Sequence, residues 1–237
     1  MPNLLHIETA TQVCSIALSL DGMLIAERES REKNIHSSVV TVFIEEVMKE
    51  AGITFKDLDA ISVSKGPGSY TGLRIGVSTA KGICFATDKP LIAIDTLQAL
   101  AWGARKMLTE KGISNKVEVL FCPMIDARRM EVFSALYNWE LKQVRETKAE
   151  IIDKDSFKKY FEEHQLWFTG DGAEKCRDFL QANPNSRFID DPMPSATYLI
   201  ELGEKKFLAG EFEDAAYFEP FYLKDFIPGI PKVKGLR

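Results

Sequence analysis

The chain has 237 residues, of which 45% are hydrophobic and 27% are charged, and its formal net charge is −5. A chain of this length folds as one large domain or two small ones, and this composition is typical of soluble globular proteins. Affinity for nucleic acid comes mostly from lysine and arginine, so the negative net charge argues against a protein that binds nucleic acid without a partner. We expect any such contact to depend on a partner.

No feature of the sequence predicts secretion or a membrane anchor. The N-terminus, from Met1 to Glu8, lacks the basic segment and apolar core of a signal peptide, and no apolar run reaches the length that spans a bilayer. The cysteines are far apart and lie mostly in apolar stretches. They predict buried free thiols in a reducing cytoplasm, with no disulfides and no zinc site. They are Cys14, Cys84, Cys122 and Cys176.

The chain opens with apolar stretches that are typical of strands. Residues 4–7 and 13–20 predict two strands, and the second alternates between apolar and polar positions. Asp21-Gly22 predicts a hairpin turn into a third strand over 23–28. We therefore expect a three-stranded meander at the N-terminus.

A helix is predicted over 37–51, with His36 or Ser37 near its start and Gly52 as its stop. Its apolar positions cover a wider arc than the roughly 100° that one core contact needs. A thick hydrophobic core would explain this arc. A second surface for another protein would also explain it, because an apolar patch edged by charge is typical of partner sites. The arc is widened by Val39, Val42 and Phe43.

The most distinctive stretch is a glycine-rich loop between an apolar strand over 60–64 and a helix-like run over 73–86. Gly66, Gly68 and Gly72 permit positive φ or a close approach to the main chain, and the helix N-terminus that follows offers unpaired N–H groups. Such a corner can bind phosphate. The loop is not a P-loop, because no Lys-Ser/Thr pair closes it, and the alternative is a tight strand-to-helix turn.

The helix after this loop is unusually rich in small residues. Small side chains recur at every fourth position on two of its sides, which lets a second helix approach closely. Arg74 and Lys81 are its only charged residues. We expect this helix to be buried on most of its circumference.

The pattern then restarts, after a strand over 91–94 and a helix from Asp95-Thr96 to about Lys111. Ile7-Glu8 and Ile125-Asp126 each end an apolar strand with an acid. The two pairs lie about half the chain apart, and Ala17-Leu18 and Ala135-Leu136 keep the same separation. These matches predict an internal duplication.

The second half predicts the same order of elements as the first. We expect two α/β lobes, each βββαβα with a mixed sheet covered by helices, divided as residues 1–115 and 116–237. The expected elements are strands over 142–150, 166–169 and 187–189 and helices over 155–164, 173–182 and 195–209, with a turn at Gly170-Asp171-Gly172.

The glycine-loop stretch from Lys65 to Gly76, with Ile7-Glu8-Thr9-Ala10 and His36-Ser37 before it and Ile94-Asp95-Thr96-Leu97 after it, resembles the TsaB (YeaZ) family. These bacterial proteins are needed to make threonylcarbamoyladenosine in tRNA. The resemblance covers about the first 135 residues well and the remainder loosely. It implies an actin-like fold (sugar kinase/Hsp70/actin, ribonuclease H-like) and a non-catalytic role beside a related catalytic subunit, TsaD.

The resemblance also implies the partners. A TsaD-type subunit is expected to bind this chain directly, and a TsaE-type ATPase and the tRNA are expected to meet it only within the complex. The product would be N6-threonylcarbamoyladenosine at position 37 of ANN-decoding tRNAs. Without its partner the chain is expected to form a homodimer, and no cofactor, metal or catalytic residue of its own is implied.

The nucleotide site of actin-like enzymes is expected to be vestigial. Glu8 and Asp126 occupy the positions of acids that face phosphates and their metal, and paired carboxylates can hold magnesium through water. Together with Gly66, Gly68 and Gly72 they are the candidate remnant of a phosphate site. The turn at Gly170 is shorter than the Gly-Gly-rich adenosine-binding turn of related kinases.

The histidines give no metal-binding pattern. TsaD carries a pair of metal-binding histidines on the helix before its glycine loop, whereas this chain has His36 alone there. His6 and His164 are also isolated, and a lone histidine is more often a cap or packing residue than a ligand. No nucleophile motif and no His-Glu-x-x-His supports the peptidase function once attached to this superfamily.

Two functions therefore compete. The chain is an interaction subunit that uses the exposed parts of its first two helices, or it is a small-molecule phosphotransferase or hydrolase that uses Glu8, Asp126 and the glycine loop. The missing adenosine turn favours the first. The tail element 220–224 also matches the family. Whether the basic residues of the tail contact RNA is left open; they are Lys224, Lys232, Lys234 and Arg237. The candidate partner interface comprises His36, Val39, Val42, Phe43, Arg74, Ser78, Lys81 and Phe85.

Overall fold

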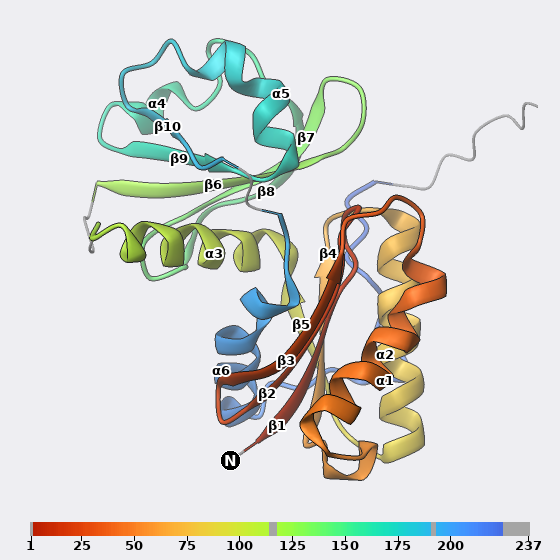
Figure 1. Ribbon diagram of the computed structural model, residues 1–237. Coiled ribbons are helices and arrows are strands. Elements are labelled where there is room, and N and C mark those ends of the chain that lie inside the picture. Colours follow the sequence, from red (N-terminus) through yellow and green to blue (C-terminus); the bar gives the residue numbers. More distant parts are fainter. Residues whose placement is uncertain (1, 114–117, 191–192, 225–237) are drawn as a thin grey trace, which may run out of the picture.

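The computed structural model describes residues 2–113, 118–190 and 193–224. They form two five-stranded mixed sheets with helices packed on their faces, and Figure 1 shows the two sheets one above the other. The basic residues Lys232, Lys234 and Arg237 of the tail lie outside the described residues. Within the described ranges, no helix combines the length and the apolar character needed to cross a bilayer.

The first sheet has the strand order β3-β2-β1-β4-β5. Its first three strands form the predicted antiparallel meander, and β4 and β5 then add in parallel to β1. The apolar run that predicted β4 is buried on both faces, because helices cover both sides of this strand. The strands are β1 (Asn3–Glu8), β2 (Cys14–Leu20), β3 (Met23–Ser30), β4 (Ala60–Gly66) and β5 (Leu91–Asp95).

Helices α1 (His36–Ala51) and α2 (Tyr70–Thr87) cover one face of this sheet. The predicted stop of α1 is confirmed, since Gly52 adopts a φ of 68°. Helix α2 begins earlier than predicted, because the side chain of Ser69 accepts a hydrogen bond from the backbone N–H of Gly72 and caps it. A single turn of 3-10 helix, η1 (Phe55–Asp57), links α1 to β4.

The second sheet repeats the first, with the order β10-β9-β6-β7-β8. The pairing senses also repeat, since β6 pairs antiparallel with β7 and parallel with β9. This repetition confirms the predicted duplicated lobes. The elements are β6 (Val119–Asp126), β7 (Glu131–Tyr137), β8 (Gln143–Ile151), α4 (Lys158–Phe161), β9 (Gln165–Thr169), α5 (Asp171–Leu180) and β10 (Ser186–Phe188).

The repeat is not uniform along the chain. Ile7 pairs with Ile16 in the first sheet, whereas Ile125 pairs with Phe133, one residue earlier than a constant spacing would give.

The predicted helix over 155–164 is wrong in length. It shrinks to the four residues of α4 because Phe157 takes a left-handed φ of 61°, which stops a helix from extending toward the N-terminus.

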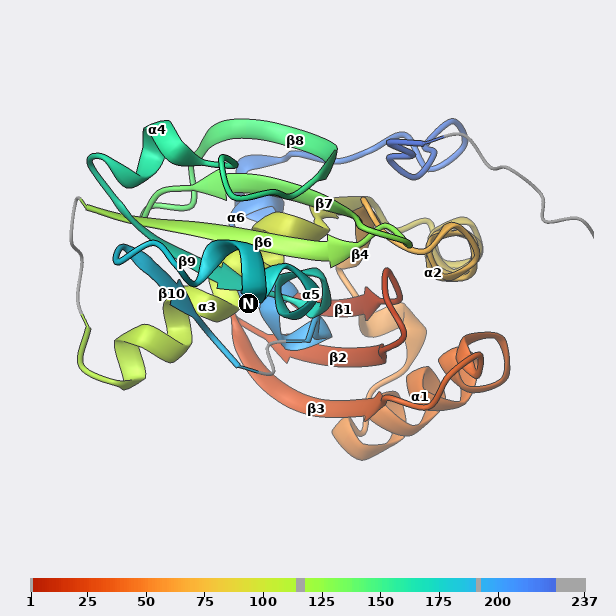
Figure 2. The ribbon, with the colours of Figure 1, turned by 90° about the horizontal axis from the view of Figure 1, so that it is seen from above.

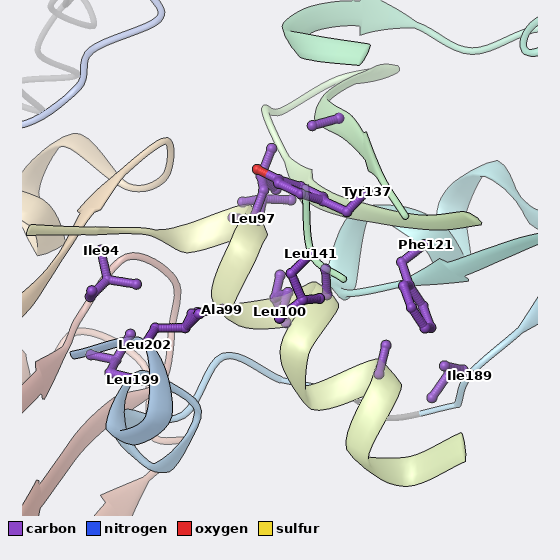
Figure 3. Close-up of a cluster of buried hydrophobic side chains, with 14 of the residues drawn as sticks. Ile94, Leu97, Ala99, Leu100, Phe121, Tyr137, Leu141, Ile189, Leu199 and Leu202 are labelled. Atoms are coloured by element: carbon purple, nitrogen blue, oxygen red, sulfur yellow. The ribbon is translucent and has the colours of Figure 1, made fainter. Parts of the chain in front are cut away.

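Helix α3 (Thr96–Glu110) connects the two halves. Asp95 caps it as predicted, accepting a hydrogen bond from the backbone N–H of Leu97 at 3.0 Å. Figure 3 shows its apolar side chains between the second sheet and the helix α6 (Ile200–Ala209). Leu100 and Phe121 belong to one buried cluster that spans both halves.

The final helical segment returns to the first sheet. We predicted one helix over 195–209, but the structure has a 3-10 turn, η2 (Ala196–Leu199), followed by α6. The backbone N–H of Ala196 donates to Ser15 Oγ at 3.0 Å, and η2 and α6 cover the face of the first sheet opposite to α1 and α2. The C-terminal part of the chain therefore completes the N-terminal sheet.

Candidate functional site: a filled glycine loop and an exposed helix face

The glycine loop is filled by the chain itself. A Cβ on Gly68 would lie 2.2 Å from the carbonyl oxygen of Ala10, and one on Gly72 would lie 2.1 Å from the carbonyl oxygen of Thr9. Gly66 has a φ of 111°, and its missing Cβ would meet the carbonyl oxygen of Phe221 at 2.7 Å. Of the three glycines, only Gly66 therefore needs positive φ, while Gly68 and Gly72 permit close packing.

These contacts do not fit a bound phosphate. The three atoms that face the loop glycines are carbonyl oxygens, which carry partial negative charge and repel phosphate oxygens. The backbone N–H of Ser69, at the start of α2, already donates to Ala10 O at 2.6 Å. The geometry favours the tight strand-to-helix turn over the phosphate site.

Glu8 is fully buried at the end of β1. Its Oε1 accepts hydrogen bonds from the backbone N–H of Ala10 at 2.6 Å and from Ser64 Oγ at 3.0 Å, while Oε2 has no hydrogen-bond partner. Burial raises the pKa of this carboxyl to about 7, and the hydrogen bonds from Ala10 and Ser64 lower it only in part. A carboxyl that is half-neutral near pH 7 and enclosed by protein is a poor ligand for magnesium.

Asp126, the counterpart of Glu8, is exposed and paired. Its carboxylate forms an ion pair with Lys175, whose ammonium group also donates to the carbonyl oxygens of Arg129 and Glu131. Its backbone N–H donates to Asp171 Oδ1 at 2.9 Å. The two predicted acids therefore have separate environments, and no magnesium-binding pair is formed by them.

The turn at Gly170 is closely packed as well. A Cβ there would lie 2.2 Å from the carbonyl oxygen of Met124, and φ is 95°. The pocket beside it contains Asp171, Glu174 and Asp190. Among the described residues that line it, Arg177 is the only cation, and it is paired with Glu174 and Asp190. This carboxylate-rich lining is unfavourable for the phosphates of a nucleotide.

His6 and His36 both have structural roles. His6 is fully buried, with Nδ1 2.7 Å from Ser62 Oγ and Nε2 2.8 Å from Ser19 Oγ, and burial lowers its pKa to about 3. His36 is buried at the start of α1, and its Nε2 lies 3.1 Å from the carbonyl oxygen of Val13. These contacts agree with the expectation that lone histidines cap or pack.

Helix α2, which we expected to be buried on most of its circumference, has one buried face and a narrower exposed face formed mainly by Arg74, Ser78, Gly82, Phe85 and Ala86. On the buried side, Ala80 and Cys84 share a core cluster with residues of α1. Gly76 makes room for the residue that follows β1, since a Cβ on Gly76 would lie 2.2 Å from Thr9 Oγ1. On the opposite face Ser78, Gly82 and Ala86 are exposed, and a Cβ on Gly82 would meet no atom within 4 Å.

Phe85 dominates the exposed face of α2. Its exposed fraction is 92%, the largest among the described large hydrophobic residues. Val42 on α1 is 46% exposed, and Figure 2 shows α1 and α2 on the same flank of the molecule. Because exposed aromatic side chains are enriched at the centres of protein interfaces, Phe85 is the candidate residue for such a contact.

The structure divides the predicted interface residues into three groups. Val42, Arg74, Ser78 and Phe85 are exposed, and Lys81 is partly exposed. Val39 and Phe43 are partly buried and pack against the core of the first half, whereas His36 is buried. The wide apolar arc of α1 thus serves partly as core and partly as surface.

Sequence reasoning missed the tail segment formed by residues 213–224. The ammonium group of Lys81 donates to the carbonyl oxygens of Ala216 at 3.1 Å and Phe218 at 3.0 Å, and Phe221 N donates to Lys65 O at 2.7 Å. These bonds hold the tail segment against α2 and the glycine loop. The match at 220–224 gave the only signal, and nothing local in it predicts where the segment packs.

Known proteins are similar in sequence to this chain. The family model described as tRNA N6-adenosine threonylcarbamoyltransferase (TsaD) matches residues 26–227. The tRNA threonylcarbamoyladenosine biosynthesis protein TsaB of Haemophilus influenzae is 26% identical over 228 residues, which cover 94% of this chain and 93% of that protein. The similarity therefore extends over nearly the full length of both chains.

Solved structures share the fold. YeaZ from Pseudomonas aeruginosa superposes with a TM-score of 0.78 at 24% identity, over 94% of this chain and 100% of that one. The activator of 2-hydroxyisocaproyl-CoA dehydratase from Clostridium difficile, solved with bound ADPNP, gives a TM-score of 0.50 at 8% identity, over 90% of this chain and 98% of that one. This chain shares its fold with both proteins, which confirms the predicted actin-like α/β fold.

Proposed function

Because this chain belongs to the TsaB (YeaZ) family, within the wider family of the tRNA N6-adenosine threonylcarbamoyltransferase model, we propose that it is a non-catalytic subunit of a tRNA-modifying complex. It binds a TsaD-type catalytic subunit and activates it. The complex forms N6-threonylcarbamoyladenosine at position 37 of ANN-decoding tRNAs. The TsaB relatives are named after this biosynthetic process. The filled glycine loop and the exposed face of α2 support a subunit that binds a catalytic partner and does not itself catalyse the reaction.

The observation that carries the proposal is the exposure of Phe85 on α2. Interfaces owe most of their affinity to a few aromatic or arginine side chains at their centre. Beside Phe85, the exposed small residues Ser78, Gly82 and Ala86 leave a flat strip along which a partner helix can approach closely. The exposed faces of α1 and α2 together form this helix face, which we assign to the TsaD-type partner.

The same helix face would pair two copies of this chain when the partner is absent. A related subunit of the same fold presents equivalent helices, so one self-complementary patch can serve a homodimer and a heterodimer. The TsaE-type ATPase and the tRNA meet this chain within the complex. No cofactor of its own is proposed.

The non-catalytic role is supported by the filled glycine loop. Ala10 O and Phe221 O pack against the glycines of the loop, Glu8 is enclosed, and Asp126 is paired with Lys175. A phosphotransferase or hydrolase would need these groups open to its substrate. Incubation of the purified chain with ATP and magnesium is therefore expected to give no turnover. Turnover that is lost in Glu8→Ala would favour the enzymatic alternative.

The decisive experiment is reconstitution. The chain would be co-purified with the TsaD homologue of the same cell, and threonylcarbamoyl transfer to tRNA would be measured with and without it. We expect a stable complex and transfer that depends on this chain. Transfer that proceeds equally well without the chain would refute the proposed activation.

A further inference from the structure

A basic groove lies in the second half of the molecule, between the edge strand β8 and the short helix α4. The side chains that line it include four cations and one carboxylate, although the whole chain has a net charge of −5. They are Arg145, Lys148, Asp155, Phe157, Lys158, Lys159 and Tyr160. We refer to this feature as the β8–α4 groove.

The base of the groove is formed by Arg145, which makes several contacts with its neighbours. The Arg145 side chain is only 12% exposed, and its Nη2 donates to both carboxylate oxygens of Glu150 at 2.5 Å. Its Nη1 donates to Ser134 Oγ at 3.1 Å, and its guanidinium lies 4.8 Å from the centre of the Phe157 ring. The left-handed φ of 61° at Phe157 places this ring beneath the guanidinium and turns the chain into α4. Arg145 therefore shapes the groove, and its charge is already balanced.

The positive charge that is available to a ligand lies on the lysines at the rim of the groove. Lys158 is 76% exposed at its side chain and lies 3.6 Å from Asp155, and Lys148 is 51% exposed and lies 4.0 Å from Glu146. Exposed ion pairs at such distances contribute little to stability. These two lysines can therefore leave their carboxylate partners and bind another anion. Lys159 places its ammonium 4.7 Å from the centre of the Tyr160 ring. This cation–π contact orients a third ammonium group without neutralising it.

We propose that the β8–α4 groove binds the phosphate backbone of RNA, with Lys148, Lys158 and Lys159 as its contacts. This inference rests on the proposed function, because tRNA is the substrate of the complex. A backbone of regularly spaced phosphates suits several separate ammonium groups around a concave surface. Three lysines are too few to hold RNA against the chain's net negative charge, so the groove adds to binding that the complex initiates.

The position of the groove is compatible with the proposed helix face. In Figure 1, α4 lies at the far upper left of the molecule, whereas α1 and α2 lie at its lower right. A partner bound to α1 and α2 would leave the groove open.

The test uses the complete complex and an unmodified ANN-decoding tRNA transcript. Binding would be measured across a range of salt concentrations for the wild-type complex and for Lys158→Glu/Lys159→Glu. Each phosphate contact contributes about 0.9 to the slope of log affinity against log salt, so the variant is expected to lower this slope by about 2. Weaker binding at low salt should accompany the lower slope.

A matched control carries the same change of charge at exposed sites outside the groove, Lys56→Glu/Lys106→Glu. We expect its salt slope to equal that of the wild type. An unchanged slope in the groove variant would overturn the proposal, and so would an equal loss in the control. Loss of the partner from the groove variant, seen by size-exclusion chromatography, would also overturn it, because the groove would then bind an acidic protein surface.

The same measurements separate failure of this inference from failure of the proposed function. If the wild-type chain does not bind the TsaD homologue or does not support transfer, the proposed function fails before the groove is tested. If the wild-type complex is active and the groove variant retains both its tRNA affinity and its slope, only the groove inference fails.

Discussion

The carbonyl oxygen of Ala10 lies 2.2 Å from the position that a Cβ on Gly68 would take. Backbone atoms cannot move aside as the end of a flexible side chain can, so Gly68→Ala must displace either the 9–11 loop or the glycine loop. We expect a loss of about 1–3 kcal/mol in the free energy of unfolding, measured by chemical denaturation. Gly68→Val and Gly72→Val should cost at least as much.

Gly82→Ala is the matched control for this prediction. It lies on the exposed face of the same helix, where a Cβ would meet nothing within 4 Å. Alanine is the better helix former by about 1 kcal/mol, so Gly82→Ala should leave the isolated chain as stable or make it more stable. Unchanged stability of Gly68→Ala, together with lost partner function, would mean that the glycine loop is itself a binding site.

Glu8 should make folding stability depend on pH. Burial raises its pKa from 4.5 to about 7, so the folded chain holds a proton that the unfolded chain releases in this range. The stabilisation is complete below pH 4.5 and is lost as pH rises through 7, amounting to about 3 kcal/mol at 1.36 kcal/mol per pKa unit. The Glu8→Gln variant stays neutral and should keep this stabilisation at pH 8.

The measured quantity is the difference in free energy of unfolding between Glu8→Gln and wild type, followed from pH 4.5 to pH 8. The difference is used because buried His6, whose pKa is lowered to about 3, acts in the opposite direction. The unfolded chain takes up a proton at His6 below pH 6.5, which destabilises both proteins equally. A difference that stays constant across this range would contradict the raised pKa of Glu8.

Phe85→Asp should dissociate the proposed partner without unfolding the chain. The ring is 92% exposed, so the isolated chain loses no packing, whereas burying an unpaired carboxylate in an apolar contact costs several kcal/mol. Size-exclusion chromatography with light scattering would follow the complex and the homodimer, and transfer to tRNA should stop. Leu208→Asp, at a 73% exposed apolar site on α6, is the matched control and should keep both assemblies.

The variant at Phe43 is less informative. Phe43 packs against the core of the first half, so Phe43→Asp should lower the thermal stability as well as affect assembly. Val42→Asp tests α1 more cleanly, because Val42 is 46% exposed. If both Phe85→Asp and Val42→Asp assemble normally, the interface lies on another surface.

Lys81→Met should loosen the tail segment. The methionine keeps most of the aliphatic stem but loses the hydrogen bonds from the ammonium group to Ala216 O and Phe218 O. We expect faster chymotryptic cleavage after Tyr217, which is 85% exposed, while the rest of the chain stays protected. Lys205→Met removes an exposed ammonium that pairs with Glu201 along α6, and its cleavage rate should match the wild type. Equal rates for all three proteins would show that other contacts hold the tail segment.

Much of this protein follows from sequence alone. Strand and helix positions, the stop at Gly52, the cap at Asp95 and the duplication all depend on local periodicity, turn chemistry and repetition, which short stretches of sequence carry. The burial of the four cysteines was also predicted correctly. The glycine-loop motif, together with the stretches around it, identified the family.

The tertiary structure decided what those elements do, because each decisive contact joins residues far apart in the chain. The periodicity of α2 could not say that one small-residue face meets Thr9 while the other, with Phe85, faces solvent. Nothing near Gly66 predicts that Phe221 fills its space, and nothing near Asp126 predicts its pairing with Lys175. Burial and pairing are properties of the packed chain, so the sequence could name the candidate residues but not tell which are enclosed and which are free to bind.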